Sequence, residues 1–152
     1  MIFNIFRKKA QLEDPESPFS FRNEMILYWS PDSEGWISPI PQLNEQAEIY
    51  IGPEEGFDNP ADLTCELVIE VLKDIENQVA EATQYLLQEI LKTKRFKEEF
   101  SSKDLKPTGL QIFEHEKTPQ EYSLTFDPIF DSGAIYKVRL NAGKIIGWSF
   151  DD

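Results

Sequence analysis

The sequence contains a single cysteine, Cys65, and a single histidine, His115. One cysteine excludes an intramolecular disulfide and any multi-cysteine zinc site. Cys65 falls in the first turn of an expected helix, where the negative charges of Asp62 and Glu66 oppose ionisation of its thiol. We therefore expect Cys65 to be a small buried apolar residue and not a nucleophile.

Two motifs that carry catalysis are also missing. No Gly-x-Ser-x-Gly sequence occurs, which excludes the usual nucleophile elbow. The segment 141–144 holds a Gly-Lys pair, but it lacks the first glycine and the following Ser or Thr of a phosphate-binding loop, and it leads into an expected strand. We expect a protein that is not an enzyme and that uses no cofactor and no metal.

Basic residues are scarce: 15 Lys and Arg stand against 28 Asp and Glu, for a formal net charge of −13. Nonspecific nucleic-acid binding depends on basic side chains that neutralise phosphates, so nucleic acid is not an expected partner. A strongly acidic surface favours a basic protein as partner. The alternative interpretation is that the acidity serves only solubility.

No apolar run approaches the roughly 18 residues of a membrane span. The apolar start of the chain, Met1–Phe6, is followed by the bases Arg7–Lys9, which reverses the charge order of a secretory signal. This order predicts a cytoplasmic protein without stable membrane association. Acids and prolines in Gln11–Pro18 are typical of a linker, so we expect residues 1–18 to form an N-terminal arm or linker and residues 19–152 to form one domain.

One long helical pattern runs from Asn59 to Leu91. Asn59 is a suitable cap and Pro60 fits the first helical position, so the helix is expected to start near Pro60. Some thirty helical residues would measure roughly 45 Å, which exceeds the width of a domain of this size. The helix therefore either overhangs or breaks between Asn77 and Thr83. Its apolar stripe comprises Leu67, Val68, Val71, Leu72, Ile75, Val79, Ala82, Leu86 and Ile90.

Strand patterns occur on both sides of this helix. The segment 24–30 is apolar on both faces and predicts a central strand, whereas Pro39 limits the next strand to an edge. Ala47, Ile49 and Ile51 alternate with polar residues, which predicts a half-buried strand. The expected strands are 19–21, 24–30, 36–40, 46–51, 110–115, 122–126, 134–141 and 144–150.

The last two of these strands flank Asn141–Lys144, in which Gly143 stands where a three-residue hairpin needs a positive φ. They should therefore be adjacent and antiparallel. Strands before and after a single long helix, with short connections, predict an α+β fold: a mostly antiparallel β-sheet with one long amphipathic helix packed across one face.

Acidic residues concentrate in the first two thirds of the chain, where Arg22 and Lys73 are the only bases between Glu13 and Leu91. A strand, the loop that follows it and the polar face of the helix would together form an anionic surface able to steer a basic protein. The candidate partner-binding residues are Glu45, Glu48, Glu54, Glu55, Asp58, Glu66, Glu70 and Asp74.

A second hypothesis is a small enzyme or ligand-binding domain with its site near His115, Asp127 and Asp131. His115 lies between two glutamates, and a His–carboxylate pair can transfer protons. Asp127 and Asp131 are four residues apart in an expected loop, a spacing that suits an ion or a pair of acids. The alternative is a solvent-facing histidine and ordinary turn residues.

The order of these elements resembles uncharacterised families of small acidic bacterial proteins, known as domains of unknown function. The segments that carry the resemblance are Ala47–Ile51, Ala82–Leu91 and Ala134–Trp148, with Gly143 and Gly147 in the last. Some of these families are similar to immunity proteins, which bind and neutralise a toxin inside the cell that produces it. The resemblance implies a non-catalytic, intracellular protein-binding module and transfers no catalytic residue.

Overall fold

The computed structural model describes residues 17–96, 99–116 and 120–151. The expected arm or linker at residues 1–18 therefore lies almost entirely outside the described residues. The described residues from Phe19 onward fold around one core, in which side chains from both helices meet side chains from the strands.

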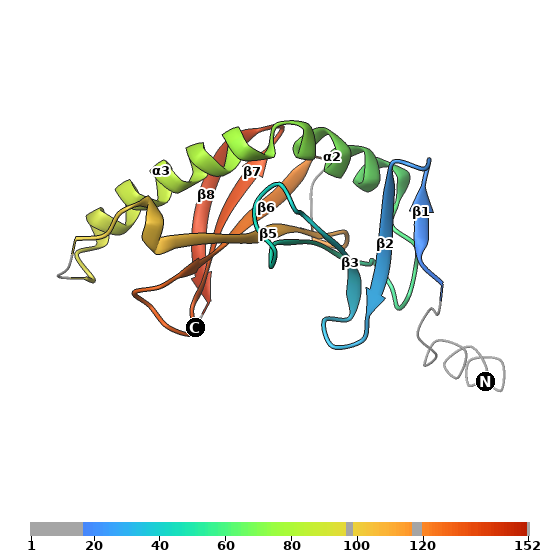
Figure 1. Cartoon of the computed structure of the whole chain (residues 1–152), viewed down its shortest axis with the longest axis horizontal. Coiled ribbons are helices and arrows are strands. Elements are labelled where there is room, and N and C mark those ends of the chain that lie inside the picture. The colour runs from blue at the N-terminus through green and yellow to red at the C-terminus, as the bar shows by residue number, and fades with distance from the viewer. Residues whose placement is uncertain (1–16, 97–98, 117–119, 152) are drawn as a thin grey trace.

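Eight strands form one sheet in the order of the chain, β1 to β8. All neighbours are antiparallel except β4 and β5, which run in the same direction, so the sheet is mostly antiparallel as predicted. A parallel pair needs a long crossover, and both helices lie in that crossover (Figure 1). The strands are β1 (Phe19–Phe21), β2 (Met25–Ser30), β3 (Gly35–Pro39), β4 (Glu48–Gly52), β5 (Leu105–Phe113), β6 (Glu121–Pro128), β7 (Ile135–Asn141) and β8 (Lys144–Asp151).

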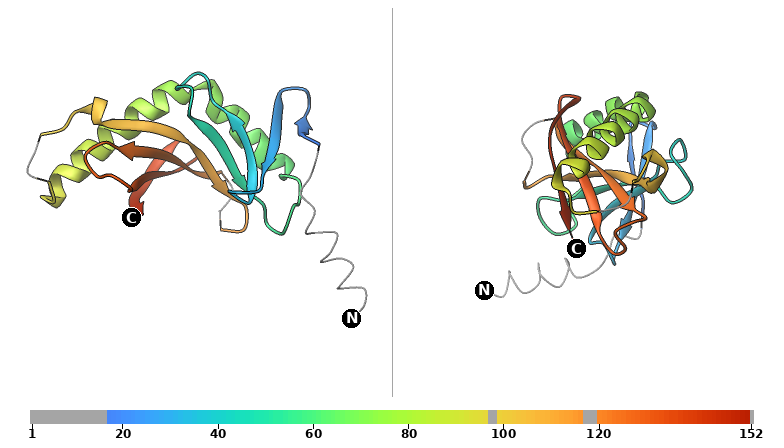
Figure 2. Two further views of the ribbon diagram at one scale, coloured as in Figure 1. Left: turned by 60° about the horizontal axis from the view of Figure 1, so that its bottom comes forward. Right: turned by 90° about the vertical axis from the view of Figure 1, so that its left-hand side faces the viewer.

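The expected single helix is two helices, α2 (Asp62–Lys73) and α3 (Ile75–Thr93), so the prediction of one long helix is wrong. They join at Asp74, whose φ of −129° and ψ of 22° are not helical, three residues before the expected break. The start also differs from the prediction, because the N-cap is Ala61 and not Asn59. Figure 2 shows from two further sides that both helices lie along the same side of the sheet.

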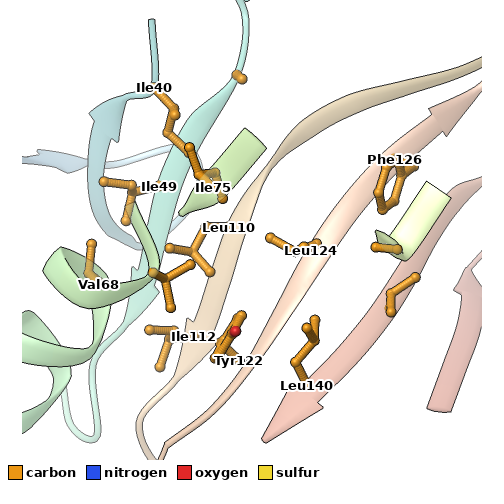
Figure 3. Close-up of a cluster of buried hydrophobic side chains, with 14 of the residues drawn as sticks. Ile40, Ile49, Val68, Ile75, Leu110, Ile112, Tyr122, Leu124, Phe126 and Leu140 are labelled. Carbon is orange, nitrogen blue, oxygen red and sulfur yellow. The ribbon is translucent and has the colours of Figure 1, made fainter. Parts of the chain in front are cut away.

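The apolar stripe of the two helices forms the core with the inner face of the sheet, as predicted. Val68, Ile75 and Leu86 are at most 1% exposed, and Leu67, Leu72 and Val79 pack partly buried against the same cluster. Figure 3 shows buried side chains from β4 to β7 gathered beside Val68 and Ile75 of the two helices. Those drawn include Ile49, Leu110, Ile112, Tyr122, Leu124, Phe126 and Leu140.

The prediction that β2 is a central strand is confirmed, since it pairs with β1 on one side and β3 on the other. Only one of its faces is buried: Ile26 and Tyr28 on the outer face are 47% and 51% exposed, because the helices cover only the other face of the sheet. The prediction that the next strand is an edge is wrong. β3 is paired on both sides and is not an edge. Pro39 is tolerated there because it occupies the last position of the strand.

The hairpin between β7 and β8 is confirmed. Its turn has two residues and not the predicted three: Ala142 and Gly143, with φ angles of 51° and 80°. Two consecutive positive φ angles are typical of a type I′ turn, the form that matches the twist of a tight hairpin. This turn brings residues 142 and 143 to the end of the sheet that lies beside α2.

Candidate functional site

A groove of about 690 Å³ runs between α2 and the near ends of β5, β6 and the β7–β8 hairpin. Its apolar side is formed by one face of α2, with Leu63, Leu67 and Val71, and by Tyr122 at the start of β6. Four glutamates line it, and no Lys or Arg is among the described residues that line it. We call it the acidic groove; its carboxylates belong to Glu54, Glu66, Glu70 and Glu114.

Glu114 is placed by the parallel pairing of β4 and β5. It directly follows β5, and its N–H donates a hydrogen bond of 2.9 Å to the carbonyl of Gly52 at the end of β4. Its carboxylate accepts hydrogen bonds from the N–H of Ala61 at 3.0 Å and from the hydroxyl of Thr64 at 2.6 Å. The anion thus lies at the N-terminus of α2, where the helix dipole and the free N–H groups favour it.

The groove face of α2 carries two parallel stripes. Leu63 and Leu67 are one helical turn apart, and so are Glu66 and Glu70. Leu63 is 72% exposed, although it is a large apolar residue. The helix therefore offers an apolar stripe and an acidic stripe, side by side, to whatever enters the groove.

Two of the groove carboxylates have basic partners at the surface. Glu66 lies 2.9 Å from the guanidinium of Arg22, and Glu70 lies 2.7 Å from the ammonium of Lys73. All four side chains are well exposed, and such surface pairs exchange easily with other partners. Both carboxylates can therefore bind a cation from another molecule.

The prediction that Cys65 is buried is confirmed, since it is 0% exposed on the inner side of α2. Burial, and next the negative charge of Glu114, raise the pKa of its thiol to about 12. Burial also raises the pKa of Tyr122 to about 12, and the hydroxyl of Tyr122 donates a hydrogen bond to the amide oxygen of Gln78. Both groups are held in their neutral forms.

Three of the eight predicted partner-binding residues, Glu54, Glu66 and Glu70, line the acidic groove. The other five lie outside it. Glu48 is the first residue of β4 and Glu45 lies in the turn before it, whereas Glu54 follows the end of β4. The remaining three are Glu55 in the same loop as Glu54, Asp58, whose main-chain carbonyl accepts a hydrogen bond of 2.9 Å from Trp36, and Asp74 at the helix junction.

Sequence reasoning missed Glu114 as a site residue and treated it only as a neighbour of His115. No local pattern reveals it, because its partners Ala61 and Thr64 are more than 45 residues earlier in the chain. Leu63 and Tyr122 were missed for the same reason. Leu63 is an apolar residue in the first turn of α2 that lies outside the predicted apolar stripe. That position was the only available signal for the groove in the sequence.

The structure does not bring together His115, Asp127 and Asp131, the residues of the alternative site. His115 is exposed beyond the end of β5 and lies 3.3 Å from Glu116, whereas Asp127 pairs with Lys106 near the start of β5. At about 3.3 Å per residue, the two ends of the nine-residue strand β5 are roughly 26 Å apart. Asp131 accepts a hydrogen bond of 2.8 Å from the hydroxyl of Tyr136. Among the residues that the structure describes, no three His, Cys, Asp or Glu side chains gather as a metal site.

Neither described helix is long and apolar enough to cross a bilayer. Comparisons of this chain with protein-family models, with curated proteins and with solved structures find no match.

Proposed function

We propose that this chain is a non-catalytic protein-binding module whose acidic groove takes up a basic, partly apolar segment of another protein. The observation that carries the proposal is the composition of the groove: an apolar side with Leu63, Leu67 and Tyr122, lined by four carboxylates and, within the part of the chain that the structure describes, by no Lys or Arg. Acidic residues that serve only solubility would be expected on the open surface and not around a concave apolar surface. A groove of this kind suits a segment that has apolar anchors and flanking cations.

The spacing of the acidic and apolar residues on α2 indicates which kind of partner segment would fit the groove. Glu66 and Glu70 are one helical turn apart, as are Leu63 and Leu67. An amphipathic helix that carries apolar anchors one turn apart, with Lys or Arg beside them, presents the complementary pair of stripes. The partner we propose is therefore a basic amphipathic helix of a protein. It is not nucleic acid, which the net charge of −13 repels.

An immunity-type role is the specific form of this proposal that the sequence resemblance supports: the groove would neutralise a basic toxin in the cytoplasm. A cytoplasmic location is part of this proposal, because an immunity-type protein meets its toxin inside the cell that produces it. A gene for a basic toxin beside the gene for this chain would support the immunity-type role, and a neighbourhood without one would argue against that role alone.

The binding proposal is tested with a designed basic amphipathic peptide whose lysines and leucines are spaced to match α2, using calorimetry on the full chain. A peptide with glutamate in place of each lysine is the ligand control. The groove variant Glu66→Gln/Glu70→Gln should weaken binding of the basic peptide roughly threefold to thirtyfold, because it loses two charge pairs worth up to about 1 kcal/mol each.

The matched control variant is Glu45→Gln/Glu48→Gln, which removes the same charge from residues outside the groove. It should change the affinity by less than the groove variant, and by an amount that vanishes at high salt. Equal weakening by the two variants would mean that only the net charge attracts the peptide. That result, or no binding of the peptide at all, would overturn the proposed function.

A further inference from the structure

The stretch Met1–Lys9 lies outside the described residues, and its sequence combines the two properties that suit the acidic groove. It has four branched or aromatic apolar residues, followed directly by three bases. Apolar anchors with cations beside them complement an apolar surface lined by carboxylates. We call residues 1–9 the basic segment; its anchors are Ile2, Phe3, Ile5 and Phe6, and its bases are Arg7, Lys8 and Lys9.

The carboxylates of the groove already pair with other bases of this chain. Arg22 and Lys73 are the only Lys or Arg residues in the sequence from 10 to 91. The guanidinium of Arg22 lies 2.9 Å from Glu66, and the ammonium of Lys73 lies 2.7 Å from Glu70. Four groove glutamates against these two bases leave a negative potential that attracts further cations.

The basic segment is joined to the domain close to the groove. Arg22, which pairs with Glu66, is three residues after Phe19, where β1 begins. Figure 1 shows β1 at the end of the molecule where α2 lies. Three strand residues measure roughly 10 Å and a helix with its side chains is about 10–12 Å across, whereas residues 10–18 extend to roughly 30 Å. The basic segment is therefore long enough in its connection to cross α2 and enter the groove.

Two apolar surfaces lie within this reach. One is the outer face of β2, where Ile26 and Tyr28 are 47% and 51% exposed. The other is the groove, where Leu63 is 72% exposed, the highest value for a large apolar residue in the part of the chain that the structure describes. The groove is favoured because it adds four carboxylates to its apolar side.

We propose that the basic segment occupies the acidic groove of its own chain and competes there with the partner helix. The inference rests on the proposed function, since it names a regulator of the same groove. The anchors of the segment cover Leu63 and Leu67, and its bases meet the carboxylates of Glu66 and Glu70. A segment joined to its site by a short linker meets it at an effective concentration on the order of 1 mM. Even weak docking therefore closes the groove to weak partners.

A nitroxide spin label on the basic segment tests the docking without any partner. The label is attached to the full chain through Asn4→Cys, because the native Cys65 is 0% exposed and does not react. NMR then records which methyl signals the label broadens. We expect strong broadening at Leu63 and Leu67 and little at Leu91, which is exposed on α3 outside the groove.

The broadening pattern also separates the other locations of the segment. Stronger broadening at Ile26 than at Leu63 would place the segment on the outer face of β2 and overturn the proposal, and so would equal broadening throughout. A mixture of spin-labelled chains and isotope-labelled chains tests for exchange between copies. Broadening in that mixture would mean that the segment docks on a second copy, which also contradicts the proposal.

Variants of the labelled chain identify the contacts. Phe3→Ser/Phe6→Ser removes two anchors and leaves the net charge at −13, and it should abolish the broadening in the groove. Leu12→Ser, which removes an apolar residue between the basic segment and β1, is the control and should leave the broadening unchanged. The groove variant Glu66→Gln/Glu70→Gln should weaken the broadening from the other side of the contact. Unchanged broadening in the double serine variant would overturn the proposal.

Competition is measured with the basic amphipathic peptide of the preceding section. Phe3→Ser/Phe6→Ser should bind this peptide roughly threefold or more tightly than the wild type, and Leu12→Ser should bind it as the wild type does. Equal affinity of all three chains would refute the competition and leave the binding module intact. Docking of the basic segment in the groove, with no peptide binding to any of the chains, would instead refute the proposed function and leave the intramolecular contact.

Discussion

The carboxylate of Glu114 accepts a hydrogen bond of 2.6 Å from the hydroxyl of Thr64, fully buried in the first turn of α2. The same oxygen accepts from the N–H of Ala61, the N-cap residue, which makes no side-chain cap of its own. In a capping box, a glutamate inside the first turn bonds the N-cap N–H. Here Glu114, which directly follows β5 on the other side of the crossover, supplies that glutamate, so the cap also fastens α2 to the sheet.

Replacement of this carboxylate should therefore destabilise the whole domain. Glu114→Ala is expected to lower the free energy of unfolding by about 1–3 kcal/mol, because it removes a cap and leaves the buried Thr64 hydroxyl without its acceptor. Denaturant unfolding measures the change. Glu116→Ala, which removes an exposed carboxylate two residues later, is the control and should change stability by less than about 0.5 kcal/mol. Equal effects would show that the cap is not structural.

The thiol of Cys65 should be inert in the folded protein. It is 0% exposed and its pKa is raised from 9.0 to about 12, so a thiol reagent at pH 8 should react only after denaturation. Full reaction of the native protein within the dead time of mixing would contradict its burial.

The same pKa shift predicts loss of stability in alkali. Between pH 9 and 12 the unfolded chain releases the Cys65 proton while the folded protein keeps it, so the free energy of unfolding falls as the pH rises. Tyr122, raised from 10.0 to about 12, acts in the same direction from pH 10. Cys65→Ala should be less stable at pH 7 but should lose stability less steeply across this range, which pH-dependent denaturation measures. An unchanged slope would contradict the prediction.

Local patterns predicted the parts of the fold that local physics determines. Alternation placed Ala47, Ile49 and Ile51 in the core, and spacings of three and four did the same for Val68 and Ile75. The hairpin at Gly143 followed from its need for a positive φ. In each case the burial or the backbone conformation is a property of a few consecutive residues.

The break at Asp74 could not be found in this way, because the apolar period continues through it from Val71 to Ile75. The available signal was Asp74 itself, a residue type that favours N-caps. The acidic groove could not be found either. It exists because the crossover lays α2 beside Glu114 and Tyr122, and no pattern within one element encodes that contact.

The turn of the β7–β8 hairpin is not optimal. Ala142 has a φ of 51°, which strains any residue with a Cβ, and asparagine tolerates this region better than alanine. Ala142→Asn creates the Asn-Gly pair that type I′ turns prefer and should raise the free energy of unfolding by about 0.5–1 kcal/mol. Gly143→Ala, at a φ of 80°, should lower it by about 1 kcal/mol. Thermal unfolding of both variants checks the opposite signs, and a shift in the same direction would contradict the turn type.

Gly109 should tolerate substitution much less well than Gly143. A Cβ at Gly109 would overlap the main-chain oxygen of Glu48, its partner across the parallel pair, whereas a Cβ at Gly143 has nothing within 4 Å. The backbones of β4 and β5 cannot move apart in the way that a flexible side chain can move aside. Gly109→Ala should therefore cost about 3 kcal/mol or more, and Gly143→Ala only the cost of its backbone conformation. Similar losses in denaturant unfolding would mean that β4 and β5 do not pair closely at this point.

A variant of Leu63 can change binding of the peptide without changing the stability of the fold. It is 72% exposed beside the acidic groove, so Leu63→Ser should leave the free energy of unfolding within about 0.5 kcal/mol of wild type. If a partner helix covers it, the variant loses much of the 1.5–3 kcal/mol that burial of a leucine contributes, and the basic amphipathic peptide should bind about tenfold more weakly. Leu91→Ser is the matched control, since Leu91 is 62% exposed on α3 outside the groove. Both variants should fold alike, and equal affinities for the peptide would show that it does not bind against α2.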